Sequence, residues 1–205
     1  MTSAPARPYA LWVRGTADLR ACSARSVAII GARAATAYGR YVSTRMAADL
    51  GATGWTVVSG GAYGIDASAH NGVLAAGGMT VAVLACGPDI AYPRPHRGLL
   101  DAIAAQGAVI SEWPPGTPPA RQRFLLRNRV IAALALGTVV VEAAAHSGTL
   151  AAARHAHDLG RPLMAVPGPV TSAMSAGCHS LIRERHALCV TGAADIAAYL
   201  PCSQL

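Results

Sequence analysis

Three glycine-bearing segments contain the residue types that could bind phosphate. They read "GARAATAYG" from Gly31, "SGGAYGID" from Ser59 and "EAAAHSGTL" from Glu142, and each follows a short apolar run. Glycine adopts backbone angles that other residues avoid, so successive amides of such a loop can turn around an anion. Where a helix starts directly afterwards, its unpaired amides and dipole also attract phosphate. The segments predict phosphate-binding loops, although each could also be a tight turn that lets a helix pack on a sheet.

The basic residues point to the same class of ligand. Arg33 follows the first apolar run, and the single phenylalanine, Phe124, lies in a run of arginines. An aromatic ring can stack on a base while guanidinium groups follow the phosphates, which is the pattern of a single-strand binder. Alternatively, Phe124 fills the core and the arginines are solvated or paired. The arginines of this run are Arg121, Arg123, Arg127 and Arg129.

Acid and base groups give weaker signals. Asp66 is expected to cap the helix that it begins or else to orient a ligand hydroxyl, with capping favoured. Glu142 ends an apolar run, where it could act as a general base or pair with an arginine, and a structural role is preferred. The histidines show no pairing with a nucleophile motif, and His155 and His157 are too close in sequence to share a helix face as metal ligands. We therefore predict no catalytic residue, no metal and no cofactor.

Composition favours a polyanionic partner. The 205 residues carry a net charge of +7, and all 17 basic residues are arginine, which grips phosphate through two parallel hydrogen bonds. No apolar run approaches the roughly 18 residues that a membrane span needs. The N-terminus lacks the pattern of a secretory signal, so a cytoplasmic location is expected. The five cysteines are widely spaced, which indicates free thiols.

Apolar runs alternate with alanine-rich stretches from residue 26 onward, which predicts a doubly wound, mostly parallel sheet sandwiched by helices, an extended Rossmann-like fold. Residues 26–205 form this predicted domain, and residues 1–25 are a lead-in whose "YALWVRG" adds an edge strand or lies over the core. The predicted strands are 26–31, 55–60, 79–87, 108–111, 138–144 and 161–168. The predicted helices are 36–50, 64–78, 95–107, 125–137 and 147–160, with residues 112–124 as a proline-rich loop and 178–200 as helix, short strand and helix.

This topology explains why the three glycine segments matter together, because the carboxyl ends of parallel strands meet at one edge of a sheet, where ligands bind. A dinucleotide site is disfavoured. The first segment is not G-x-G-x-x-G, and Ser59 stands where such a site needs an acidic residue.

The motifs resemble those of the bacterial DNA-processing protein A (DprA/Smf) family. "VAIIGARAATAYGR", "TVVSGGAYGIDASAH", "RNRVIAAL" and "VVVEAAAHSGTLAAARHA" occur here in the family order, and the resemblance runs from about Ser26 to Leu200. It implies a protein, not an enzyme, that binds incoming single-stranded DNA in natural transformation, protects it and helps to load the RecA recombinase. It also implies a homodimer formed through this domain.

The resemblance implies a set of DNA-contacting residues. "FLLRNRVIAALAL" departs from the usual "FPxRNRIIAGLS", and "LIRERHA" from "LIRxGA", which leaves the local loop shapes open. The length leaves no room for the N-terminal helical and C-terminal winged-helix domains of many members, so their functions are not expected here. The expected contacts are Arg33, Ser59, Gly60, Gly61, Ala62, Gly64, Ile65, Asp66, Arg121, Phe124, Arg127, Asn128, Arg129, Ser147, Gly148 and Thr149.

A nucleotide-binding enzyme remains the alternative. The segment "EAAAHSGTLAAA" resembles the "PGGxGTxxE" motif of phosphoribohydrolases of the same fold superfamily, but alanines at 151–153 stand where their catalytic glutamate falls. A module that senses a nucleotide signal is a third hypothesis.

Overall fold

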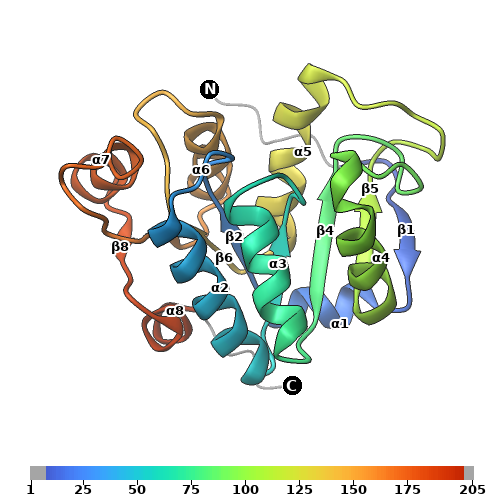
Figure 1. Cartoon of the computed structure of the whole chain (residues 1–205), viewed down its shortest axis with the longest axis horizontal. Helices are drawn as coiled ribbons and strands as arrows, with labels where there is room; N and C mark the ends of the chain where they lie inside the picture. The colour runs from blue at the N-terminus through green and yellow to red at the C-terminus, as the bar shows by residue number, and fades with distance from the viewer. Residues whose placement is uncertain (1–7, 201–205) are drawn as a thin grey trace.

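The computed structural model describes residues 8–200, which form an eight-stranded sheet between two layers of helices (Figure 1). Its strand order is β1-β5-β4-β3-β2-β6-β7-β8, and every neighbouring pair is parallel except β1 with β5. The predicted α/β, doubly wound class is confirmed. The strands are β1 Trp12–Gly15, β2 Ser26–Ile30, β3 Thr56–Ser59, β4 Thr80–Leu84, β5 Ala108–Ser111, β6 Gly137–Val140, β7 Leu163–Ala165 and β8 Leu188–Cys189.

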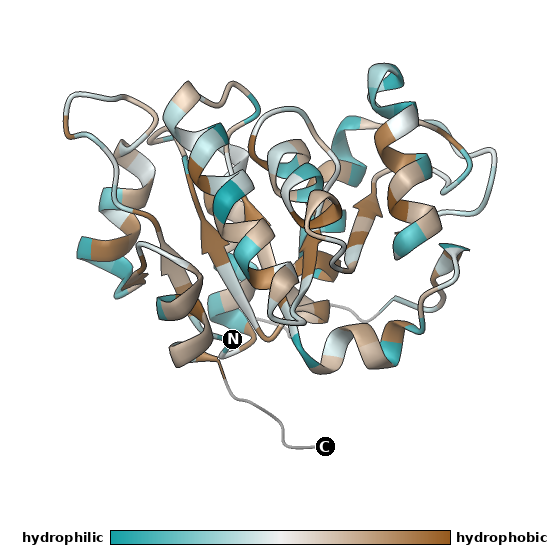
Figure 2. Ribbon diagram, turned by 60° about the horizontal axis from the view of Figure 1, so that its bottom comes forward, coloured by the Kyte–Doolittle hydropathy of each residue, from teal (hydrophilic) through white to brown (hydrophobic). Residues whose placement is uncertain are grey.

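The helices divide between the two faces of the sheet. Strand residues alternate in direction, so that in β2 Val27 and Ile29 pack on one layer while Ala28 and Ile30 pack on the other. Figure 2 shows the sheet as a largely apolar band between these layers. One layer contains α2 Ala37–Ala52, α3 Ile65–Ala75, α4 Arg97–Gln106 and α8 Ala193–Tyr199; the other contains α1 Leu19–Ala24, α5 Arg121–Leu134, α6 Gly148–Asp158 and α7 Ala176–Arg185.

The chain reverses its direction of winding at β2. Strands β3, β4 and β5 are added on one side of β2, after which β6 pairs with its other side. In open α/β sheets the crevice at such a reversal, outside the carboxyl ends of the strands, is where ligands bind. The three glycine segments follow β2, β3 and β6, so the predicted gathering of these loops at one edge is confirmed.

The N-terminal segment adds an edge strand, one of its two predicted alternatives. Strand β1 runs antiparallel to β5, with Trp12 opposite Ser111 and Gly15 opposite Ala108. Residues 1–7 of the predicted lead-in lie outside the described part of the chain, as do residues 201–205. Between these limits the structure contains no helix long and apolar enough to cross a membrane.

The helix boundaries confirm one predicted cap, correct another, and correct the predicted end of the proline-rich loop. Thr36 caps α2 by accepting a hydrogen bond from the Gly39 amide at 3.2 Å, as predicted. The expectation that Asp66 caps its helix is wrong, because Gly64 takes that position and Asp66 lies in the first turn. The expectation that residues 121–124 belong to the loop is also wrong. Helix α5 starts at Arg121. The last proline of the segment is Pro119, Ala120 is extended, and no proline interrupts the residues that follow.

Candidate nucleic-acid interface

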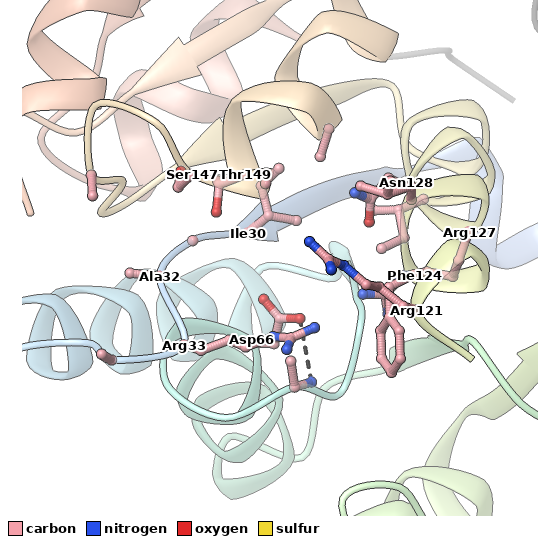
Figure 3. A pocket seen from close by; sticks show the side chains of 18 of the residues that line it. Ile30, Ala32, Arg33, Asp66, Arg121, Phe124, Arg127, Asn128, Ser147 and Thr149 are labelled. Atoms are coloured by element: carbon pink, nitrogen blue, oxygen red, sulfur yellow. Dashed lines mark hydrogen bonds between the residues drawn. The ribbon is translucent and has the colours of Figure 1, made fainter. Parts of the chain in front are cut away.

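A pocket of about 730 Å³ opens at the carboxyl ends of the central strands. Its walls come from the loop after β2, the start of α3, the first half of α5 and the start of α6, and Figure 3 shows their side chains facing one another across the opening. This is the crevice expected at the reversal of winding. The predicted site residues that line it are Arg33, Ala62, Asp66, Arg121, Phe124, Arg127, Asn128, Ser147, Gly148 and Thr149.

Two exposed arginines in this pocket have unengaged guanidinium groups. Within residues 8–200, neither Arg33 nor Arg121 makes a side-chain hydrogen bond or an ion pair. The Arg33 guanidinium carbon lies over the Phe124 ring, 5.0 Å from its centroid, and the Tyr92 ring lies 5.5 Å from Phe124. Phe124 is half-buried and lines the pocket, so it does not fill the core. An aromatic ring beside two available cations suits the bases and phosphates of a single strand.

The other predicted arginines are engaged by the protein itself. Arg127 is only 5% exposed, and its Nη1 donates to the carbonyls of Gly60 and Val83, both at 2.6 Å. Arg129 lies outside the pocket, where its Nη2 pairs with Glu112 at 2.5 Å. These hydrogen bonds fix the ends of β3 and β4 and the loop after β5. A DNA contact by either arginine remains a prediction.

The glycine loop, residues 60–64, encloses a carboxylate of the protein. Gly64 has a φ of 78°, and an added Cβ would come within 2.2 Å of the Ala32 carbonyl oxygen, so only glycine fits there. The Ala62 amide donates to Asp66 Oδ2 at 3.3 Å, the contact dashed in Figure 3. The ring of amides predicted to surround a ligand phosphate therefore points in part at Asp66.

Asp66 and Arg127 are buried groups of opposite charge that lie near each other behind this loop without a direct hydrogen bond. Burial raises the pKa of Asp66, and the nearby Arg127 guanidinium opposes that shift. Burial likewise lowers the pKa of Arg127, with Asp66 opposing it. Five predicted contacts of this region do not line the pocket, and their contact with DNA stays a prediction: Ser59, Gly60, Gly61, Gly64 and Ile65.

The start of α6 offers unsatisfied hydrogen-bond donors to the pocket. Ser147 is the N-cap residue, yet its hydroxyl makes no capping bond, and its buried Oγ has no partner among the described residues. No acidic residue occupies the first turn of this eleven-residue helix. Free amides, the helix dipole and the hydroxyl together favour an anion at this position.

Glu142 has a structural role at the same edge. Its carboxylate, on a side chain that is 2% exposed, accepts hydrogen bonds from the Thr36 amide at 2.9 Å and the Thr36 hydroxyl at 2.6 Å. Its main-chain carbonyl accepts from the Ala32 amide at 2.7 Å. Both ends of the loop that contains Arg33 are thus attached to Glu142, two residues after β6, and Glu142 pairs with no arginine of residues 8–200.

Sequence reasoning missed several pocket residues, of which Tyr92 is the clearest. It lies in the loop after β4 and packs against Phe124. The signal available was an aromatic residue just after a predicted strand of the same sheet, in "AYPRP". Within residues 8–200, no three His, Cys, Asp or Glu side chains gather as they would around a metal ion.

Comparison with known proteins identifies the family. The family model described as "DNA recombination-mediator protein A" matches residues 1–201.

This chain belongs to the DNA recombination-mediator protein A family.

Its relatives include the "Putative DNA processing protein DprA" of Mycobacterium tuberculosis H37Rv, which is 52% identical over 193 residues, or 94% of this chain and 49% of the relative. The chain thus spans about half the length of this curated relative. The X-ray structure of DNA processing protein A from Streptococcus pneumoniae superposes with a TM-score of 0.86 at 36% identity, covering 93% of this chain and 66% of that one.

A second solved relative is described by the ligand that it binds. The structure of DNA processing protein A from Helicobacter pylori has a TM-score of 0.85 at 28% identity, covers 94% of this chain and 87% of that one, and concerns a "single-stranded DNA binding mode". The sequence resemblance leaves the local shape open after Phe124, where this chain has Leu125 in place of the expected proline. The structure shows a continuous helix there, with Leu125 and Leu126 about half exposed.

Proposed function

We propose that this chain binds single-stranded DNA in the pocket at the reversal of winding, as a DNA-processing protein of natural transformation. The observation that carries the proposal is the set of unengaged groups around one aromatic ring: two guanidinium groups, and a helix start whose N-cap hydroxyl has no partner. The role is binding rather than turnover, since protection of DNA needs affinity and no bond cleavage.

Each wall of the pocket suits a different part of a nucleotide. A phosphate fits the start of α6, where the free amides can donate to it. A base can stack on the pair formed by Arg33 and Phe124, because guanidinium planes and aromatic rings both stack on bases. Arg121 stands beside this pair at the start of α5 and can neutralise the next phosphate.

Family membership supports the wider role. The relatives are described as DNA-processing proteins, and the Helicobacter pylori structure is described by its single-stranded DNA binding. Protection of incoming DNA, loading of RecA, formation of a homodimer and a cytoplasmic location complete the proposal by analogy with the family.

The proposal is tested by titrating a fluorescent oligothymidylate with the protein across a range of salt concentrations. We expect tighter binding of single strands than of duplex, with no dependence on sequence. Loss of a stacking ring costs about 1–3 kcal/mol per base, so Phe124→Ala should weaken binding about 5- to 150-fold. Arg33→Ala removes the cation that stacks on the same ring, so this variant should also bind more weakly than the unaltered chain.

The control is Arg183→Ala, which removes one positive charge from α7, where Arg183 pairs with Glu184. Equal affinity for duplex, or normal binding by both pocket variants, would refute the proposal. A nucleotide-cleaving enzyme would instead release free base from nucleoside monophosphates, which we do not expect.

A further inference from the structure

We propose that the single-stranded DNA track extends out of the pocket across the segment Tyr92–Arg97 and the ring of Tyr63. This inference rests on the proposed function, because it names a second stretch of surface for the same ligand. The segment follows β4 and includes the 3-10 turn Arg94–His96, directly before α4. Because β3 and β4 are parallel neighbours, the loops after them lie at the same edge of the sheet.

The segment is continuous with the pocket. Tyr92, at its start, lines the pocket and packs against Phe124. At its other end the His96 ring is hydrogen bonded to the glycine loop, with Nδ1 donating to the Gly61 carbonyl at 3.0 Å. The Tyr63 ring of that loop packs edge-on against His96, with centroids 4.7 Å apart. The two loops therefore form one surface that leads away from the pocket wall.

Two positive charges on this surface lack partners within residues 8–200. Arg94 and Arg97 are exposed, and neither guanidinium makes a hydrogen bond or an ion pair there. The acidic residues nearest to them in the sequence are already engaged: both oxygens of Asp89 accept from the Gly116 amide at 3.0 Å, and Asp101 pairs with Arg14 at 2.8 Å.

Local electrostatics make these arginines unfavourable for the isolated protein. They lie just before and at the first residue of α4, where the helix dipole is positive, and no acidic residue occupies the first turn. Arginines are stabilising at the opposite end of a helix. An anion bound here would relieve the repulsion, which argues for a negatively charged partner.

Exposed aromatic rings make that partner a nucleic-acid strand. Tyr92 is 41% exposed and Tyr63 is 46% exposed, although both rings already pack against neighbours on one side. Rings that alternate with arginines provide stacking faces and phosphate contacts along one direction. A small phosphate would need only the arginines, and a protein partner would not require the pattern to continue from the pocket.

The test compares a short and a long oligothymidylate, of about 4 and about 16 nucleotides, the two ends of the range of single-strand site sizes. Binding of each to the full chain is measured by fluorescence anisotropy across salt concentrations. For Arg94→Ala/Arg97→Ala we expect the salt slope to fall by about 1.4 with the long strand, two contacts of about 0.7 each, and to stay unchanged with the short strand. Tyr63→Ala should weaken the long strand alone, and Tyr63→Phe should restore it.

The matched control is Arg20→Ala/Arg185→Ala, which removes the same charge at the amino ends of the strands, since α1 precedes β2 and α7 precedes β8. The extension is overturned if the control lowers the slope as much as Arg94→Ala/Arg97→Ala. It is also overturned if the latter variant weakens the short strand equally, because the residues would then belong to the pocket. If the unaltered chain binds neither strand, the proposed function fails and the extension with it.

Discussion

The arginine behind the glycine loop and those in front of it differ in whether their guanidinium groups are hydrogen bonded to the protein itself. Behind the loop, Arg127 donates to two strand-end carbonyls and lies near the buried Asp66. In front of it, Arg33 and Arg121 make no polar contact with the described residues, and the Ser147 hydroxyl has none. The inner groups therefore shape the site, whereas the outer groups are available to a ligand.

The largest difference between the groups behind the glycine loop and those in front of it should be in the stability of the protein when they are removed. We expect Arg127→Ala to lower the free energy of unfolding by about 3–5 kcal/mol, because it leaves two main-chain carbonyls without their donor and the buried Asp66 without a nearby positive charge. Urea unfolding followed by circular dichroism measures this, with Arg123→Ala as a control on the same helix. If Arg127→Ala is as stable as the control yet loses DNA binding, Arg127 belongs with the outer groups.

A second inner group should make stability depend on pH. His70 is fully buried, its Nδ1 donates to the Thr80 hydroxyl at 2.8 Å, and its Nε2 has no partner among the described residues. Burial lowers the pKa of His70 from 6.5 to about 3, with the positive charges of His96 and Arg127 adding to the effect. Between these pH values the unfolded chain binds one more proton than the folded chain, so acid favours unfolding.

Stability from this group is thus complete above pH 6.5 and is lost as the pH falls toward 3, by about 1.4 kcal/mol per pH unit. We expect urea unfolding curves at pH 6.5 and pH 5 to show this loss. His70→Asn, whose side-chain amide can still donate to Thr80, should have a flatter profile, whatever its stability at neutral pH. Parallel profiles for the two proteins would contradict the assignment.

The smallest effects should distinguish two arginines of the same helix. Arg121→Ala should lower the salt slope of DNA binding by about 0.7 and leave unfolding unchanged. Arg129→Ala should lower the salt slope by less than Arg121→Ala, because its guanidinium is already paired with Glu112, and should lower stability by about 1 kcal/mol or less, because that pair is only partly buried. For both variants, anisotropy gives the salt slope of DNA binding and urea unfolding gives the free energy of unfolding. If Arg129→Ala lowered the salt slope more and Arg121→Ala lowered the stability more, the roles of these arginines would be reversed.

Much of the fold was predictable because it depends on local pattern. The apolar run at 108–111 and the threonine before α2 are specified by neighbouring residues, and both predictions are confirmed. The start of α5 was not, because arginine, glutamine and phenylalanine at 121–124 have no strong preference against a loop. The preceding extended Ala120 decides it, and its conformation depends on tertiary packing.

The location of the site was predictable from the sequence, but which of its arginines are hydrogen bonded to the protein was not. Strand ends and glycines place the three loops at one edge, as the topology confirms. Whether an arginine is free depends on residues distant in sequence: Arg127 finds the Gly60 carbonyl 67 positions away. Arg121 and Arg127 therefore look alike in the sequence and differ in the structure.

The hydrogen bonds of Ala32 join all three loops of this edge. Its amide donates to the Glu142 carbonyl, and its own carbonyl accepts from the Ile65 amide at 3.2 Å. The loops after β2, β3 and β6 are consequently one mechanical unit, and a distortion introduced in one will be transmitted to the others. Loss of binding by a single loop variant thus reports on the integrity of the whole unit, and assigning a contact requires paired substitutions whose effects are compared for additivity.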